Sequence, residues 1–204
     1  MFIGKWNRSV ILTYVGLIIS CFGFWFCSKH QTTQACACLV AAGLCDLFDG
    51  LIARSIKRDK SEKLFGIQLD SLVDAVSFIA LPIAIIFSDG LAQWYTVFIA
   101  AFFAICGVAR LAYFNIETAK PDKRVMHYRG LPVTFTALIL PLIPALLCWK
   151  NSLGETLFIM QFLMIIIGVL NIANVKIPKP KGLAYPIFLI LGLFLTGFLF
   201  SLWA

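Results

Sequence analysis

Seven apolar runs, each about as long as a membrane-spanning helix, make up most of this chain. The hydrocarbon core of a bilayer is about 30 Å thick, and a helix needs about 20 largely apolar residues to cross it. Hydrophobic residues form 61% and charged residues 13% of the sequence, a more apolar balance than in soluble domains. We therefore expect an all-α protein, a polytopic transmembrane helical bundle. The expected spans are Ser9–Cys27, Thr32–Ala53, Ile67–Phe87, Trp94–Phe114, Pro132–Trp149, Leu157–Ile172 and Tyr185–Trp203.

The connections between these runs are short, so residues 1–204 are expected to form a single integral-membrane domain. The first run is read as a span and not as a signal peptide. It is long, and its end, "SCFGFWFC", is too bulky for a signal-peptide cleavage site.

The basic residues predict the orientation of the bundle. If the N-terminus is cytosolic, 14 of the 17 basic residues lie on the cytosolic side, as the positive-inside rule requires. The net charge of +7 suits the anionic headgroups of a cell membrane. Because these charges are spread over membrane-adjacent loops, we expect no nucleic-acid partner. The 14 residues are Lys5, Arg8, Arg54, Lys57, Arg58, Lys60, Lys63, Lys120, Lys123, Arg124, Arg129, Lys176, Lys179 and Lys181.

Four aspartates interrupt the second and third apolar runs. Asp46 and Asp49 are three residues apart, and Asp70 and Asp74 are four apart, so each pair shares one face of its helix. The loop between the runs is cytosolic, so the two helices run antiparallel. Asp46 is eight residues from Arg54 and Asp74 is eight from Gly66, which places both roughly 12 Å from the expected helix ends. The four carboxylates are therefore expected to converge near the cytosolic face.

Such a convergence of carboxylates needs a compensating charge. A charged side chain inside a bilayer costs a few kcal/mol, and four like charges also repel one another. Basic partners are one solution, but Arg110 is the only cation within the expected spans. Divalent cations are another, because hard oxygen ligands suit magnesium, manganese or calcium. Gly50 and Ala53 leave room for a ligand near the backbone, and Arg54 offers a donor fork for phosphate.

The segment "CDLFDGLIARSIKRDKSEKLFGIQLDSLVDA" resembles the signature of the CDP-alcohol phosphatidyltransferase family, D-x2-D-G-x2-A-R followed by G-x3-D-x3-D. One departure is that eleven residues separate Arg54 from Gly66, where the common pattern has about eight. The additional residues fall in a charged loop, where extra length is tolerated. The matching residues are Asp46, Asp49, Gly50, Ala53, Arg54, Gly66, Asp70 and Asp74.

This resemblance implies the transfer of a phosphatidyl group from CDP-diacylglycerol to an alcohol, with CMP as the leaving group. It implies that Asp46, Asp49 and Asp70 hold two divalent cations, Mg²⁺ or Mn²⁺, which grip the diphosphate. Asp74 is implied to be the general base and also to contact a metal. Binding of the nucleotide and diphosphate falls to Asp46, Gly50, Ala53, Arg54 and Gly66. A homodimer in the lipid bilayer is a further expectation from the family.

Two later segments indicate which alcohol is used. "VARLAYFNIETAK" (108–120) and "YRGLPVT" (128–134) resemble parts of bacterial phosphatidylserine synthases, a subgroup of this family. The expected substrate is therefore L-serine, and Arg110 would pair bidentately with its carboxylate. Asn115 is the second candidate contact. Arg110 balancing an aspartate or binding lipid phosphate, and Asn115 capping its helix, remain alternatives.

Two other functions remain open. The same chemistry with glycerol-3-phosphate or an inositol phosphate needs the same aspartates. A small divalent-cation transporter would also place aspartates in the membrane. Transporters, however, often show repeated halves or broken helices, and neither is visible here. A transporter would also leave Gly50, Ala53, Arg54 and Gly66 without a role.

Overall fold

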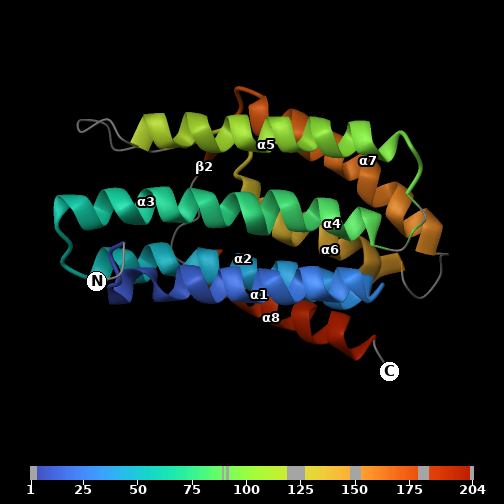
Figure 1. Cartoon of the computed structure of the whole chain (residues 1–204), viewed down its shortest axis with the longest axis horizontal. Coiled ribbons are helices and arrows are strands. Elements are labelled where there is room, and N and C mark those ends of the chain that lie inside the picture. The colour runs from blue at the N-terminus through green and yellow to red at the C-terminus, as the bar shows by residue number, and fades with distance from the viewer. Residues whose placement is uncertain are drawn as a thin grey trace.

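The computed structural model describes residues 4–88, 90, 92–118, 127–147, 153–178 and 184–202, and most of them are helical. The helices pack lengthwise into a bundle (Figure 1), so the expected all-α architecture is confirmed. The helices are η1 (Arg8–Val10), α1 (Ile11–Ser28), α2 (Thr32–Ser55), α3 (Lys60–Asp74), η2 (Ala75–Ala80), α4 (Leu81–Phe87), α5 (Thr96–Thr118), η3 (Val133–Phe135), α6 (Thr136–Leu147), α7 (Leu153–Ile172) and α8 (Ala184–Ser201).

Five of the seven expected spans correspond to helices long and apolar enough to cross a membrane. The expected fifth and seventh spans correspond to shorter apolar helices within the described residues, Val133–Leu147 and Tyr185–Ser201. The expected ends at Trp149 and Trp203 lie outside those residues, as do the basic residues at 120, 123, 124, 179 and 181. The five long helices are Arg8–Ser28, Thr32–Ala53, Lys60–Phe87, Thr96–Glu117 and Gly154–Ile172.

The third span begins earlier than the sequence predicts, at Lys60 and not at Ile67. Asp59 and Glu62 form a capping box: Asp59 Oδ1 accepts from the Glu62 backbone N–H at 2.6 Å, and Glu62 Oε2 accepts from the Asp59 N–H at 2.9 Å. This pair satisfies two of the N–H groups that a helix start leaves unbonded. The helix therefore extends through the charged residues that follow Asp59.

This third helix changes its winding partway along. α3, η2 and α4 form one continuous rod (Figure 1), and η2 is a π-helical segment in the middle of it. The π-helical segment begins at Ala75, directly after Asp74. Helical backbone angles at both junctions, Ala75 and Leu81, keep the rod unbroken.

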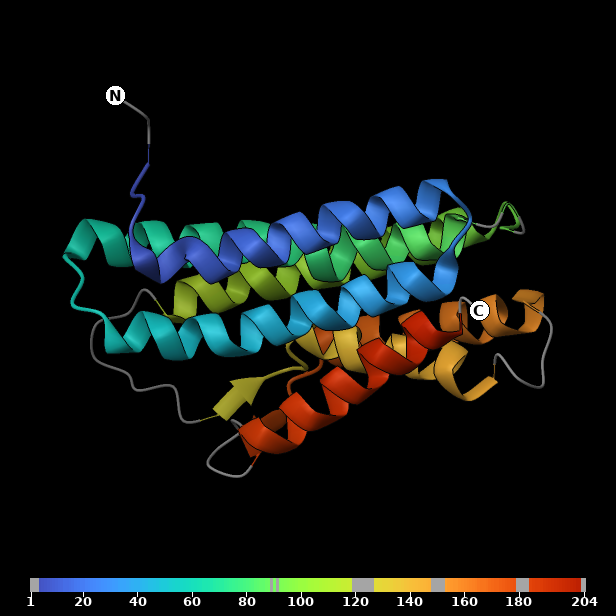
Figure 2. The same ribbon diagram turned by 90° about the horizontal axis from the view of Figure 1, so that it is seen from below.

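The core of the bundle lies around α2, which packs against α1, α6 and α8. Figure 2 shows α1 alongside α2, with α8 running at an oblique angle to α2. Small residues permit the close approach of α1: a Cβ on Gly16 would lie 3.3 Å from the Cys45 Cβ, and one on Gly23 would lie 3.2 Å from the Cys38 Cβ. Close backbone approach of this kind is a common way for helices to associate in membranes.

Two three-residue strands were not predicted from the sequence. β1 (His127–Arg129) pairs antiparallel with β2 (Lys176–Pro178), which joins the segment before α6 to the segment after α7. Gly130 follows with φ 76°, and its N–H donates to the Val175 carbonyl at 2.9 Å. A Cβ at Gly130 would overlap the Asn171 carbonyl, so only glycine fits. This junction fixes where the chain enters η3 and α6.

Candidate active site

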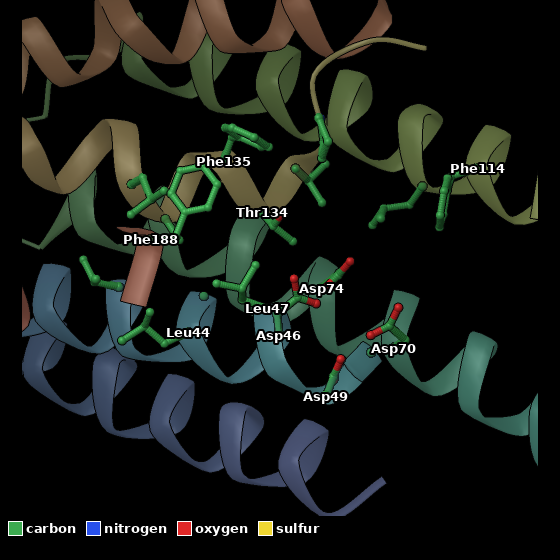
Figure 3. Close-up of a pocket in the computed structure, with 18 of the residues that line it drawn as sticks. Leu44, Asp46, Leu47, Asp49, Asp70, Asp74, Phe114, Thr134, Phe135 and Phe188 are labelled. Atoms are coloured by element: carbon green, nitrogen blue, oxygen red, sulfur yellow. The ribbon is translucent and has the colours of Figure 1, made fainter. Parts of the chain in front are cut away.

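The four aspartates come together on facing sides of α2 and α3 (Figure 3), as their helical spacing predicts. One oxygen from each of Asp46, Asp49 and Asp70 lies within 4.8 Å of the others. The Asp74 carboxyl lies beside that of Asp46 (Figure 3). Asp49 and Asp74 are buried, whereas Asp46 and Asp70 are half-buried. Four carboxyl groups thus form one compact cluster with a partly open side.

Asp74 lies farther from the start of its helix than the sequence predicts. Because α3 begins six residues before Gly66, Asp74 lies 14 residues, or about 21 Å, from the start of its helix and not about 12 Å. The antiparallel pairing of α2 and α3 still brings the two pairs of carboxylates side by side (Figure 3). The capping box at Asp59 lengthens α3 without disturbing the cluster.

A cavity of about 280 Å³ opens beside the carboxylates. Apolar and aromatic side chains line the other end of the cavity, and Figure 3 shows Leu44, Phe135 and Phe188 on the side away from Asp49 and Asp70. A cavity with charge at one end and apolar walls at the other suits an amphipathic ligand. The remaining wall residues are Val40, Gly43, Leu47, Gly50, Arg110, Leu111, Phe114, Pro132, Val133, Thr134, Ala137, Leu138 and Tyr185.

Arg110 and Asn115, both on α5, occupy different positions relative to this cavity. Arg110 is buried in the cavity wall, and its guanidinium lies over the Phe114 ring, 5.4 Å from the ring centroid. Asn115 accepts a hydrogen bond from Ser71 Oγ at 2.7 Å and, among the described residues, is not part of the cavity wall. Arg110 can therefore reach a ligand directly, whereas the described bond of Asn115 leads to α3.

The other signature positions flank the aspartates. Gly50 lines the cavity and Ala53 follows it on α2, half-buried. The Arg54 backbone belongs to α2, but its side chain lies outside the described part of the structure. Gly66 leaves room for the guanidinium of Arg58, since a Cβ at Gly66 would lie 3.2 Å from Arg58 Nη1.

One residue at the cluster was missed by the sequence reading. Thr13 on α1 is buried, and its hydroxyl donates to Asp49 Oδ2 at 2.8 Å. A signal was present in the sequence: small and hydroxyl-bearing residues recur at helical spacing along one face of α1. These buried residues are Thr13, Gly16, Ser20, Gly23 and Cys27.

The chemistry of the cluster fits a divalent cation. Its donors are hard carboxylate oxygens, which magnesium, manganese and calcium prefer. Three of them are close enough to share an ion, and the partly open side leaves space for water or a ligand oxygen. The concentrated negative charge also makes a cation the natural occupant.

Fold and site together define a polytopic membrane protein with a carboxylate cluster at one end of an amphipathic cavity. The family model of CDP-alcohol phosphatidyltransferase matches residues 6–175. This chain therefore belongs to the CDP-alcohol phosphatidyltransferase family.

Individual relatives point to one subgroup of that family. The chain is 38% identical over 130 residues to the CDP-diacylglycerol–serine O-phosphatidyltransferase of Saccharomyces cerevisiae, a match that covers 60% of this chain and 46% of the yeast protein. The Helicobacter pylori protein of the same name is 27% identical over 197 residues, 91% of this chain and 78% of that protein. The archaetidylserine synthase of Methanothermobacter thermautotrophicus is 28% identical over 175 residues, 83% of this chain and 66% of that protein. The chain thus spans less than half of the yeast relative but most of the bacterial one.

Proposed function

We propose that this protein transfers the phosphatidyl group of CDP-diacylglycerol to L-serine, giving phosphatidylserine and CMP. The observation that carries the proposal is the cluster of four carboxylates at the polar end of an amphipathic cavity, in a chain that carries all eight signature residues. The choice of serine is supported by the names of the relatives, which specify serine or archaetidylserine.

The aspartates divide into two roles in this proposal. Asp46, Asp49 and Asp70, with a contact from Asp74, would hold two divalent cations, Mg²⁺ or Mn²⁺. Bound there, such cations neutralise the charge of the diphosphate and of the leaving nucleotide. Gly50 and Ala53 have small side chains that leave space for the diphosphate beside α2. Arg54 and Gly66 are proposed to bind the nucleotide.

Asp74 is proposed to accept the proton of the serine hydroxyl, because a carboxylate within hydrogen-bonding reach is a competent general base. The serine oxygen then forms a bond to the phosphorus that carries diacylglycerol. The bond from that phosphorus to the oxygen of CMP breaks, and CMP leaves with the electron pair. The proton remains on Asp74 until it passes to water.

The alcohol is proposed to bind between Asp74 and α5. Arg110 lines the cavity and is oriented by the Phe114 ring, so its guanidinium can pair with the serine carboxylate. Asn115 is kept as a second proposed contact, with its bond to Ser71 as the competing role.

The protein is proposed to be a multi-pass protein of the cell membrane, with its N-terminus and active site on the cytosolic side. The excess of basic residues in the loops on that side supports this orientation. Cysteines introduced at Lys60 and at Lys29 should react with an impermeant thiol reagent from opposite sides. Reaction of Lys60→Cys from the outer side alone would contradict it. The homodimer expected from the family remains a prediction.

The proposed activity is tested by transfer of radiolabelled alcohols to lipid, using purified protein and CDP-diacylglycerol in detergent. Labelled serine should enter lipid, EDTA should stop the transfer, and Mg²⁺ or Mn²⁺ should restore it. Labelling by glycerol-3-phosphate or an inositol phosphate in place of serine would establish the alternative alcohol. Absence of any transfer, together with Mn²⁺ uptake into proteoliposomes, would establish a transporter.

A further inference from the structure

The hydroxyl of Thr13 joins α1 to a cluster that the family signature places on α2 and α3 alone. It donates to Asp49 Oδ2 at 2.8 Å across 36 residues of sequence, and the bond is buried. A threonine hydroxyl in an apolar helix can bond to its own backbone, so a bond directed at another helix's carboxylate calls for an explanation.

The donor is held in place by the packing of α1. One turn along the helix, Gly16 packs against Cys45 on α2, and a Cβ on Gly16 would lie 3.3 Å from the Cys45 Cβ. One turn further, the hydroxyls of Ser20 and Ser77 are hydrogen-bonded at 2.7 Å, which ties α1 to η2. Thr13 therefore presents its hydroxyl at a fixed position relative to Asp49.

The bond restricts what the Asp49 carboxylate can do. The terminal torsion of an aspartate is broad, so an unrestrained carboxylate swings readily about its last bond. A hydroxyl on Oδ2 selects one orientation and leaves further lone pairs of the carboxylate for another ligand. One Asp49 oxygen then stays within 4.8 Å of oxygens from Asp46 and Asp70.

We propose that Thr13 is a positioning residue for the divalent-cation site, acting through Asp49. It touches neither substrate nor cation, and it orients the carboxylate that binds the cation. The inference rests on the proposed metal-binding function of the aspartates. Partners of this kind, one bond removed from a metal, typically change metal affinity or activity by about 10- to 100-fold when removed.

The test measures Mn²⁺ binding directly, by calorimetry or electron paramagnetic resonance, on the purified full chain without substrate. Thr13→Val keeps the shape and removes the hydroxyl, and it should weaken Mn²⁺ binding by about 10- to 100-fold. Thr13→Ser keeps the hydroxyl and should bind within a few-fold of wild type. Thr196→Val makes the same change on α8, where the threonine hydroxyl is buried without a partner among the described residues, and should leave binding unchanged.

The outcomes distinguish failure of the metal site from failure of the positioning role of Thr13. If wild type binds no Mn²⁺, the metal site itself fails. If wild type binds and Thr13→Val binds equally well, or Thr13→Ser binds as weakly as Thr13→Val, the role of Thr13 is overturned. Should Thr13→Val not fold, Thr13→Ala and Thr13→Ser decide the matter, with weak binding for alanine and near-normal binding for serine expected.

Discussion

The two walls of the cavity are assembled in different ways. The charged wall comes from one helical hairpin, in which α2 and α3 contribute all four aspartates from neighbouring stretches of chain. The opposite wall is gathered from α5, η3 with α6, and α8, which are far apart in the sequence. Its position depends on remote contacts such as the pairing of β1 with β2.

We associate the charged wall with the transfer reaction and the assembled wall with the choice of alcohol. The hairpin carries the four carboxylates of the proposed cation site, and α1 is bonded to this region through Thr13 and Ser20. The assembled wall carries Arg110, the proposed partner of the alcohol, together with aromatic side chains. Substitutions in the first wall should therefore abolish the reaction, whereas those in the second should alter affinity or selectivity.

The largest effect is expected in the charged wall. Asp46→Asn, Asp49→Asn and Asp70→Asn each neutralise a carboxylate that is proposed to bind a cation. Each should lower serine transfer by more than the 10- to 100-fold typical of an indirect partner, to near background. Asp59→Asn is the matched control, because Asp59 is exposed and asparagine also caps helices, and its activity should stay within about twofold. Full activity of the wild-type protein in EDTA would refute the metal site.

Asp74→Asn should separate binding from reaction. Asparagine fills the same space but accepts a proton poorly, so transfer should fall by about 10²- to 10⁴-fold. CDP-diacylglycerol binding, measured with radiolabelled lipid, should persist. If lipid binding falls as much as transfer does, Asp74 contributes to binding of the diphosphate and is not the general base.

Arg110→Lys probes the assembled wall. Lysine keeps the charge but loses the planar fork that pairs with a carboxylate. A charge-assisted hydrogen bond contributes about 1.5–3 kcal/mol, so the Michaelis constant for serine should rise roughly 10- to 100-fold. The Michaelis constant for CDP-diacylglycerol should change little. Equal increases for both substrates would assign Arg110 to the lipid phosphate or the aspartates.

The smallest effect should come from the support of the assembled wall. Gly130→Ala forces a side chain into a left-handed conformation and against the Asn171 carbonyl, which should destabilise the protein by about 1–3 kcal/mol. Thermal unfolding in detergent measures the loss of stability. Transfer kinetics should also show a few-fold rise in the Michaelis constant for serine. Gly197→Ala on α8 is the control, because its Cβ would meet nothing within 4 Å. Equal stability of the two variants would show that the β1–β2 junction does not hold the wall.

The sequence predicted the charged wall well because its information is local. Intervals of three and four residues place Asp46 with Asp49, and Asp70 with Asp74, whatever the rest of the chain does. The start of α3 was placed too late because the charged residues between Arg54 and Gly66 were assigned to a loop, although the spacing of Asp59 and Glu62 is that of a capping box.

The assembled wall could not be predicted in the same way. In a chain with 19 phenylalanines, nothing local distinguishes Phe135 and Phe188, which line the cavity, from those exposed on the outside of the bundle. Thr13 was missed because its partner lies 36 residues away. The strands β1 and β2 are three residues each, too short to give an alternating pattern.

The π-helical segment η2 sets the rotation of α4 relative to α3 within the third helix. A π-turn holds about one residue more than an α-turn, so removal of one residue from Ala75–Ala80 would restore ordinary winding. If all six residues instead adopted ordinary α winding with no residue removed, α4 would turn by about 100° relative to Asp70 and Asp74, and Ile85 and Ile86 would leave the core. A chimaera that joins the aspartate-bearing half of this protein to the far half of a relative should therefore keep η2 intact and place its junction after Ala80. With the junction after Ala80, η2 has already set the rotation of α4 relative to Asp70 and Asp74. The chimaera therefore keeps the native orientation of both helices.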